Sequence, residues 1–133
     1  MDSADLLRDE FGNWLDFGTA VEARVLERMP STPGVFAVRR DSPYQRRIGT
    51  SDLVYIGVGA NQQGLRMRVR QIFHPGPSQT TNQRLLDLMK RSNEYQLGFA
   101  VTSDREEANA LKKRLLERYR GEHGELPPEN RAL

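Results

Sequence analysis

The fold is decided by residues 53–73, which read LVYIGVGANQQGLRMRVRQIF. The first six of these residues form an apolar run rich in β-branched side chains, which predicts a buried strand. A glycine-containing loop follows at residues 59–64. Apolar residues then return at positions 65, 69, 72 and 73, the spacing of one face of an amphipathic helix. The centre of the chain therefore predicts a strand, a short loop and a helix.

The flanking sequence predicts two more strands and four more helices. Residues 34–39 (GVFAVR) and 95–101 (YQLGFAV) are short apolar runs next to turn-forming residues. Helices are expected at 3–15 with Ser3 as N-cap, at 19–29, from Thr80 or Thr81, and from the Ser103–Glu106 capping box to about residue 122. Residues 40–51 are polar and predict a loop. The fold class is therefore α+β, a small, mainly antiparallel three-stranded sheet flanked by helices, with an N-terminal helical extension.

Length and composition indicate one domain. A chain of 133 residues is long enough for a hydrophobic core and too short for two comfortable domains. We divide it into an acidic helical extension, residues 1–30, and a body, residues 31–133. There are no cysteines, which fits a cytoplasmic protein, and we expect neither a secretory signal nor a membrane span.

Positive charge is concentrated in the middle of the chain. Residues 39–91 contain ten Arg and Lys against three Asp, whereas residues 1–30 contain three basic and seven acidic side chains. A local excess of this kind can attract a polyanion. A solvated, arginine-rich surface would give the same composition, so charge alone does not decide between them.

The motifs resemble those of the GIY-YIG nuclease family. Tyr55, Ile56 and Gly57 spell the second half of the family signature, and Gly34, Val35 and Phe36 stand in place of the first half, as GVF. The helix LRMRVRQIF is similar to the arginine-bearing helix of the family, with Arg68 at the catalytic position. The last predicted helix and the PPEN segment that ends at Asn130 are similar to the family's glutamate helix and following asparagine.

The resemblance implies a partner and a chemistry. Members of the family hydrolyse DNA phosphodiesters with one divalent metal held by a glutamate, so DNA is the expected partner and Mg²⁺ or Mn²⁺ the expected cofactor if the chain is active. Arg68 would hold a phosphate or stabilise its transition state, because a guanidinium can grip two oxygens. Tyr55 would position water or phosphate, Gly34 and Gly57 are motif glycines, and Asn130 would bond near the site. Structural roles, namely a salt bridge for Arg68, a core aromatic for Tyr55 and a turn for Asn130, remain alternatives.

Two site residues depart from the family pattern. Phe36 keeps an aromatic ring but has no hydroxyl and cannot relay a proton. Lys112 stands where the family has its glutamate, on the apolar stripe formed by Ala108, Leu111, Leu115, Leu116 and Tyr119. An ammonium cannot ligate a divalent cation. Three interpretations of Lys112 stay open: it binds phosphate directly, it extends its charge to the edge as a structural residue, or it is an engineered inactivating substitution.

Other basic residues are candidates for nucleic-acid contacts. Arg66 and Arg70 neighbour Arg68, His74 closes the same helix, and Arg46 and Arg47 lie in the predicted 40–51 loop. Three functions follow from these residues: a DNA-binding domain with lost or reduced catalysis, an active endonuclease with a rearranged metal site, and a protein-interaction module that uses residues 1–17. Whether the chain is an enzyme stays open, because no metal ligand can be assigned with confidence.

Overall fold

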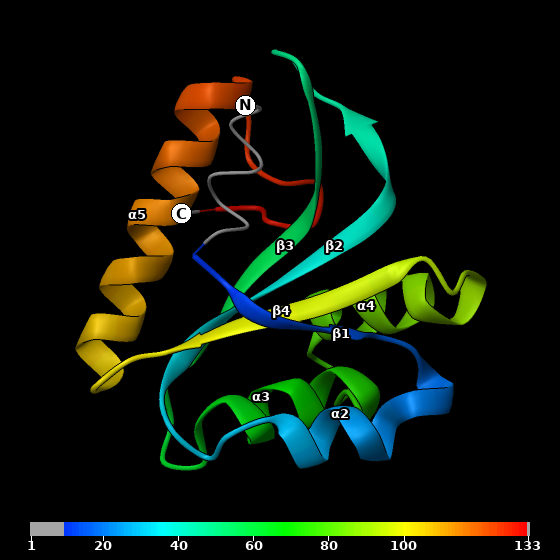
Figure 1. The fold of residues 1–133 in the computed structure, drawn as a ribbon, viewed down its shortest axis with the longest axis vertical. Helices are drawn as coiled ribbons and strands as arrows, with labels where there is room; N and C mark the ends of the chain where they lie inside the picture. Colours follow the sequence, from blue (N-terminus) through cyan, green and yellow to red (C-terminus); the bar gives the residue numbers. More distant parts are fainter. Residues whose placement is uncertain (1–9, 133) are drawn as a thin grey trace.

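The computed structural model describes residues 10–132 and confirms an α+β fold (Figure 1). Its centre is one antiparallel sheet with strand order β1-β4-β2-β3. The strands are β1 (Gly12–Asp16), β2 (Gly34–Gln45), β3 (Thr50–Gly59) and β4 (Tyr95–Val101). The central pair places Phe36 opposite Gly57 and Val38 opposite Tyr55, so the two halves of the GVF and YIG motifs face each other across neighbouring strands.

The prediction of three strands was wrong by one. Residues 12–16, expected to end a helix, form β1 and pair with β4 through Leu15 opposite Leu97 and Asp16 opposite Gln96. The apolar spacing of Phe11, Trp14 and Leu15 suits a helix, but pairing with the edge of β4 decides the conformation instead. The rest of the expected helix, including the Ser3 cap, lies outside the described residues.

The expected 40–51 loop is mostly strand. Strand β2 continues to Gln45 and β3 starts at Thr50, so a long hairpin with a short turn replaces the loop. Residues 41–43 are exposed, because this part of the hairpin extends beyond the packed core. A ribbon without a buried face carries no apolar alternation, and its sequence therefore reads as loop.

The helices follow the sequence closely. They are the 3₁₀ turn η1 (Thr19–Val21), α2 (Glu22–Arg28), α3 (Gly64–Phe73), α4 (Thr80–Arg91) and α5 (Arg105–His123). The capping box of α5 lies one residue later than expected, because Asp104 is the N-cap and accepts a hydrogen bond from the Glu107 backbone at 2.8 Å. Gly124 ends α5 in the left-handed conformation, with φ of 75°.

The helices form a layer on each side of the sheet. Helix α5 packs on one face, over a cluster that includes Val35, Ala37 and Ile56. Helices α2, α3 and α4 lie on the other face, over a cluster that includes Phe36 and Tyr55 (Figure 1). Strand β3 is a sheet edge and touches both α3 and α5, so residues from both layers can meet along it.

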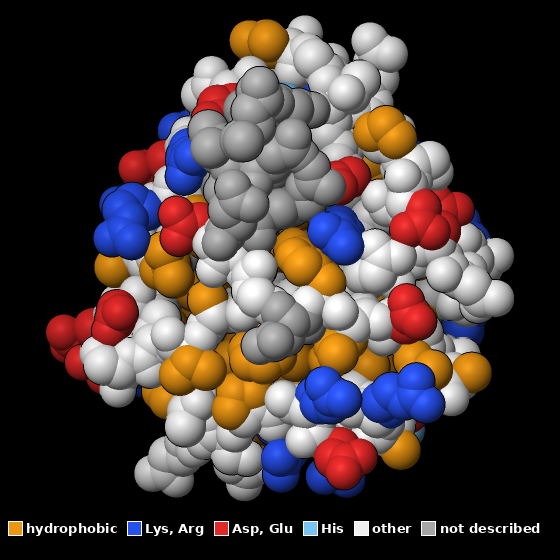
Figure 2. Space-filling view, in the orientation of Figure 1, with side chains coloured by type: hydrophobic (Ala, Val, Ile, Leu, Met, Phe, Trp, Pro, Cys, Tyr) orange, Lys and Arg blue, Asp and Glu red, His pale blue; other side chains and the backbone are white. Residues whose placement is uncertain are grey.

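Charges of both signs share the face seen in Figure 2. Lys and Arg side chains on its described part lie among Asp and Glu side chains, with hydrophobic side chains exposed between them. A surface of mixed sign offers little net attraction to a polyanion. Within residues 10–132, no helix is long and apolar enough to cross a membrane.

Candidate functional site

Arg68 is the centre of a polar site between α3, α4 and β3. Its Nη1 donates to Asn82 Oδ1 at 2.6 Å, and its Nη2 donates to the Tyr55 hydroxyl at 3.1 Å. The guanidinium carbon lies 5.3 Å from the Phe36 ring centroid and 6.0 Å from that of Tyr55. The half-buried arginine is thus fixed by two hydrogen bonds and two aromatic rings.

The hydrogen bonds of this site leave donors free for an anion. A guanidinium has five N–H groups, and Arg68 uses two of its nitrogens toward protein groups. Since the Tyr55 oxygen accepts from Arg68, its own O–H proton is available to another acceptor. The arrangement can therefore bind an oxyanion such as phosphate with charge-assisted hydrogen bonds.

Asn82 connects Arg68 to the segment between α3 and α4. Its Nδ2 donates to Gln79 Oε1 at 3.1 Å, and the same oxygen accepts from the Gly76 backbone at 2.9 Å. Asn82 is buried within α4, so it orients Arg68 and does not cap the helix. Sequence reasoning missed this role, although an asparagine inside a helix is an unfavourable choice that hints at a side-chain function.

Gly57 makes room for the two aromatic rings. A Cβ atom at this position would lie 2.5 Å from Phe36 Cζ and 2.6 Å from Tyr55 Cε2. Gly34 is equally constrained, since a Cβ there would lie 2.5 Å from the Ala100 carbonyl oxygen. Both motif glycines therefore permit close packing of the sheet around the Arg68 site.

Asn130 lies at the outer edge of β3. Its Oδ1 accepts from the Ile56 backbone N–H and its Nδ2 donates to the Ile56 carbonyl, both at 2.9 Å. The side-chain amide thus satisfies the edge groups next to Tyr55, as a neighbouring strand would. Asn130 also closes the turn after the two prolines, since its backbone N–H donates to the Pro127 carbonyl at 3.0 Å.

Lys112 stands apart from these residues. It is half-buried on α5, between the buried Ala108 and Leu116, as the helical spacing predicts. Within residues 10–132 it makes no hydrogen bond or ion pair. The structure therefore brings Tyr55, Phe36 and Arg68 together, and Lys112 lies on α5, the helix that packs against the same edge strand β3 from the other layer.

The described residues do not fit a divalent cation. No group of three or more His, Asp or Glu side chains lies together anywhere between residues 10 and 132. At the position where the family resemblance implies a carboxylate ligand, the chain has the ammonium of Lys112, which repels a cation. We therefore derive no chemical step through a metal.

Arg46 and Arg47 lie at the tip of the hairpin. Arg46 donates to the Leu126 carbonyl at 2.6 Å and pairs with Glu125 at 3.0 Å, and its side chain is 11% exposed. The backbone N–H of Arg47 donates to Glu125, while its side chain is exposed. Arg46 thus fastens the hairpin to the C-terminal segment, and Arg47 is the more accessible cation.

Arg66, Arg70 and His74 follow one another on a different face of α3. Arg66 Nε donates to the Met29 carbonyl at 2.9 Å, and His74 Nε2 lies 2.6 Å from Glu22 Oε2. Arg70 is exposed and, among the described residues, has no hydrogen bond or ion pair. These three side chains line a pocket against α2, which the sequence did not indicate because α2 supplies its other wall.

Antiparallel β2 and β3, the arginine helix α3 and the flanking α5 define the fold of a GIY-YIG nuclease domain. The structure is similar to the crystal structure of the N-terminal GIY-YIG endonuclease domain of UvrC from Thermotoga maritima, bound to magnesium. The two chains are 21% identical, with a TM-score of 0.53 over 83% of this chain and 96% of that domain.

Two mutant structures of the Thermotoga domain match equally well. Both are tyrosine-to-phenylalanine point mutants bound to the catalytic divalent cation, with TM-scores of 0.55 and 0.53, 21% identity, and coverage of 84% of this chain and 96% of the other. No family model and no curated protein sequence matches the chain. The likeness establishes the fold, and function has to be argued from the residues.

Proposed function

We propose that this chain is a DNA-binding domain on the GIY-YIG nuclease fold, with lost or reduced phosphodiester hydrolysis. The observation that carries the proposal is the fixed guanidinium of Arg68, which keeps unused donors beside the Tyr55 hydroxyl. A phosphate oxygen is the natural acceptor for such a pair. Residues 39–91 contain ten Arg and Lys against three Asp, which supplies cations for further phosphate contacts.

Further contacts to the DNA backbone are proposed for cations outside the Arg68 site. Arg70 and Arg47 have accessible side chains, and Arg66 keeps its two terminal nitrogens free of protein partners among residues 10–132. Arg46 and His74 are weaker candidates, since each already has an acidic partner. The body, residues 31–133, would carry these contacts, and residues 1–30 would support it through β1.

Reduced hydrolysis is proposed from Lys112 in particular. The tyrosine-to-phenylalanine mutants of the Thermotoga domain still hold the cation. By analogy, we expect the missing hydroxyl of Phe36 to impair proton transfer without preventing metal binding. A lysine at the ligand position would impair metal binding itself, because it removes a carboxylate and adds a positive charge where the cation would bind. An active enzyme would need Mg²⁺ or Mn²⁺ and another carboxylate ligand.

Fluorescence anisotropy with labelled duplex DNA tests the binding proposal. We expect Arg68→Ala to lower the affinity by about 1–3 kcal/mol and to reduce the slope of log Kd against log salt by about 1. Arg120→Ala is the matched control, because Arg120 is exposed on α5 and its removal changes the net charge equally. Circular dichroism checks that both variants are folded. Equal affinities for the two variants would contradict the proposal.

A further inference from the structure

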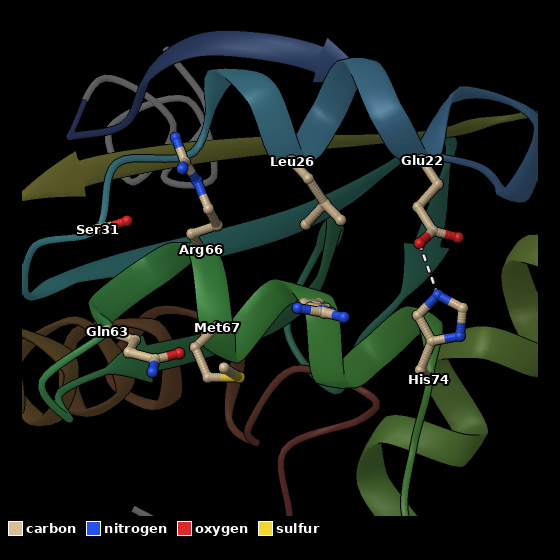
Figure 3. A pocket seen from close by; sticks show the side chains of 8 residues that line it. Glu22, Leu26, Ser31, Gln63, Arg66, Met67 and His74 are labelled. Carbon is tan, nitrogen blue, oxygen red and sulfur yellow. Dashed lines mark hydrogen bonds and ion pairs between the residues drawn. The ribbon is translucent and has the colours of Figure 1, made fainter.

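Helices α2 and α3 enclose a pocket with a volume of about 320 Å³ (Figure 3). This volume falls in the range of roughly 300–1,000 Å³ that is usual for small-molecule sites. Leu26 from α2 and Met67 from α3 provide apolar wall. Ser31 and Gln63 add neutral polar groups at the end where α3 begins. The pocket is therefore suited to an organic molecule with both apolar and polar parts.

The one acid of the pocket is already paired. Glu22 Oε2 lies 2.6 Å from His74 Nε2, and Figure 3 shows this pair at one end of the pocket. The remaining charges of the lining are the guanidinium groups of Arg66 and Arg70. The pocket thus contains two guanidinium groups that have no acidic partner among residues 10–132.

The two arginines are placed to act on one ligand. They are four residues apart on α3, which puts their Cβ atoms about 5–6 Å apart on the same face. Arg66 uses its Nε for the Met29 carbonyl, which fixes its direction and leaves both terminal nitrogens to a ligand. Among residues 10–132, Arg70 has no hydrogen bond or ion pair. Two guanidinium groups that line one pocket match a dianion better than the single charge of a carboxylate.

The pocket is separate from the Arg68 site. Positions 66 and 68 differ by about 200° around a helix, and positions 66 and 70 by about 40°. Arg68 accordingly contacts Asn82 and Tyr55, whereas Arg66 contacts Met29 and lines the pocket with Arg70. A ligand in this pocket need not contact Arg68, on which the proposed duplex binding chiefly rests, although it would use Arg66 and Arg70, for which further backbone contacts are proposed.

We infer that this pocket binds a phosphomonoester, with its phosphate on Arg66 and Arg70 and its organic group against Leu26 and Met67. A phosphomonoester carries a charge of about −1.5 to −2 at neutral pH, which the two arginines neutralise. The same group occurs on a free nucleotide and at a phosphorylated 5′ end of a nucleic-acid strand. The inference goes beyond the proposed function, because it requires neither cleavage nor binding of a duplex.

Isothermal titration calorimetry of the full chain with adenosine 5′-monophosphate and with adenosine tests the inference. We expect the nucleotide to bind about tenfold or more tightly than the nucleoside. Arg70→Ala should weaken nucleotide binding by about tenfold, and Arg70→Lys should weaken it less, because lysine keeps the charge but loses the fork. Arg120→Ala, an equal change of charge on α5, should leave the affinity within about twofold.

The outcomes separate this inference from the proposed function. Equal binding of nucleotide and nucleoside, or equal affinities of Arg70→Ala and Arg120→Ala, would overturn it, whatever Arg68→Ala does to duplex binding. The Arg70 side chain is exposed and lacks a partner in the described chain, so its loss should leave the fold intact. A short single strand with and without a 5′ phosphate then identifies the source. An Arg70-dependent preference for the phosphorylated strand assigns the pocket to strand ends, and a preference confined to the nucleotide assigns it to free nucleotides.

Discussion

At the scale of single residues, Asn130 illustrates how one polar side chain protects an exposed sheet edge. Strand β3 has no neighbouring strand on its outer side in the described sheet, so its N–H and C=O groups there need other partners. Asn130 bonds both groups of Ile56, and the Glu129 N–H donates to the Val54 carbonyl at 3.0 Å. This contact keeps the backbone beside Tyr55 in place.

Replacing Asn130 should therefore cost stability. Asn130→Ala leaves the buried N–H and C=O of Ile56 without partners, and we expect the free energy of unfolding to fall by about 2–3 kcal/mol. Asn130→Asp keeps an oxygen that accepts from the Ile56 N–H and loses the amide N–H that donates to the Ile56 carbonyl. We therefore expect this variant to lose one hydrogen bond, where Asn130→Ala loses both. Urea denaturation measures both variants. An unchanged midpoint for Asn130→Ala would show that water replaces the amide at no cost.

Tyr44 gives a prediction at high pH. Burial, followed by the neighbouring Tyr95, raises the pKa of Tyr44 from 10.0 to about 12, and burial also raises the pKa of Tyr119. The folded chain then holds more protons than the unfolded chain between these pH values, so stability falls as pH rises from about 10 to about 12. In Tyr44→Phe this fall should become shallower. The measurement is the urea midpoint of both proteins across this pH range. A parallel decline of the two midpoints would contradict the assignment of this pH dependence to Tyr44.

At the scale of elements, a tight side-chain contact adds to the pairing of β1 with β4. Trp14 on β1 packs over Gly98 of β4, where a Cβ atom would lie 2.8 Å from the indole ring. The Arg39 guanidinium carbon lies 4.2 Å from the centroid of this ring. The absence of a side chain at position 98 thus makes room for the Trp14 ring on β4.

A pair of glycine substitutions tests this contact. Gly98→Ala should push Trp14 outward and lower the free energy of unfolding by about 1–3 kcal/mol. Gly121→Ala makes the same chemical change on α5, where a Cβ would meet nothing within 4 Å, and should raise stability by about 0.5–1 kcal/mol. Thermal unfolding of both variants measures the two changes in stability. Equal effects would mean that Trp14 does not depend on Gly98.

The elements also show which parts of the fold were predictable. Strand β4 was predicted with its observed bounds, and α3 to within one residue, because burial imposes a clear apolar period on both. Strand β1 was missed because its conformation depends on pairing with a strand about 80 residues away. The motif named Arg68 and Tyr55 as candidates, whereas the bond between Arg68 and Asn82 and the pocket against α2 depend on contacts between separate elements.

At the scale of the whole molecule, the fold places two basic sites on opposite faces of one helix. Arg68 turns toward β3 and α4, while Arg66 and Arg70 turn toward α2. The nuclease-like architecture is kept, with Gly34 and Gly57 permitting its close strand packing. The proposed difference is chemical, since the family resemblance implies a hydroxyl at position 36 and a carboxylate at position 112, where this chain has Phe36 and Lys112. The proposed DNA binding therefore does not depend on DNA hydrolysis.

Plasmid cleavage in magnesium and in manganese tests this separation most directly. The assay compares the unsubstituted chain, Lys112→Glu, and Lys112→Glu combined with Phe36→Tyr, with Lys113→Glu as a control for charge on the exposed neighbouring position. We predict that the unsubstituted chain and Lys113→Glu leave the plasmid intact, and that the restored carboxylate at position 112 produces metal-dependent nicking, which the added hydroxyl at position 36 increases. Metal-dependent cleavage by the unsubstituted chain would contradict the account.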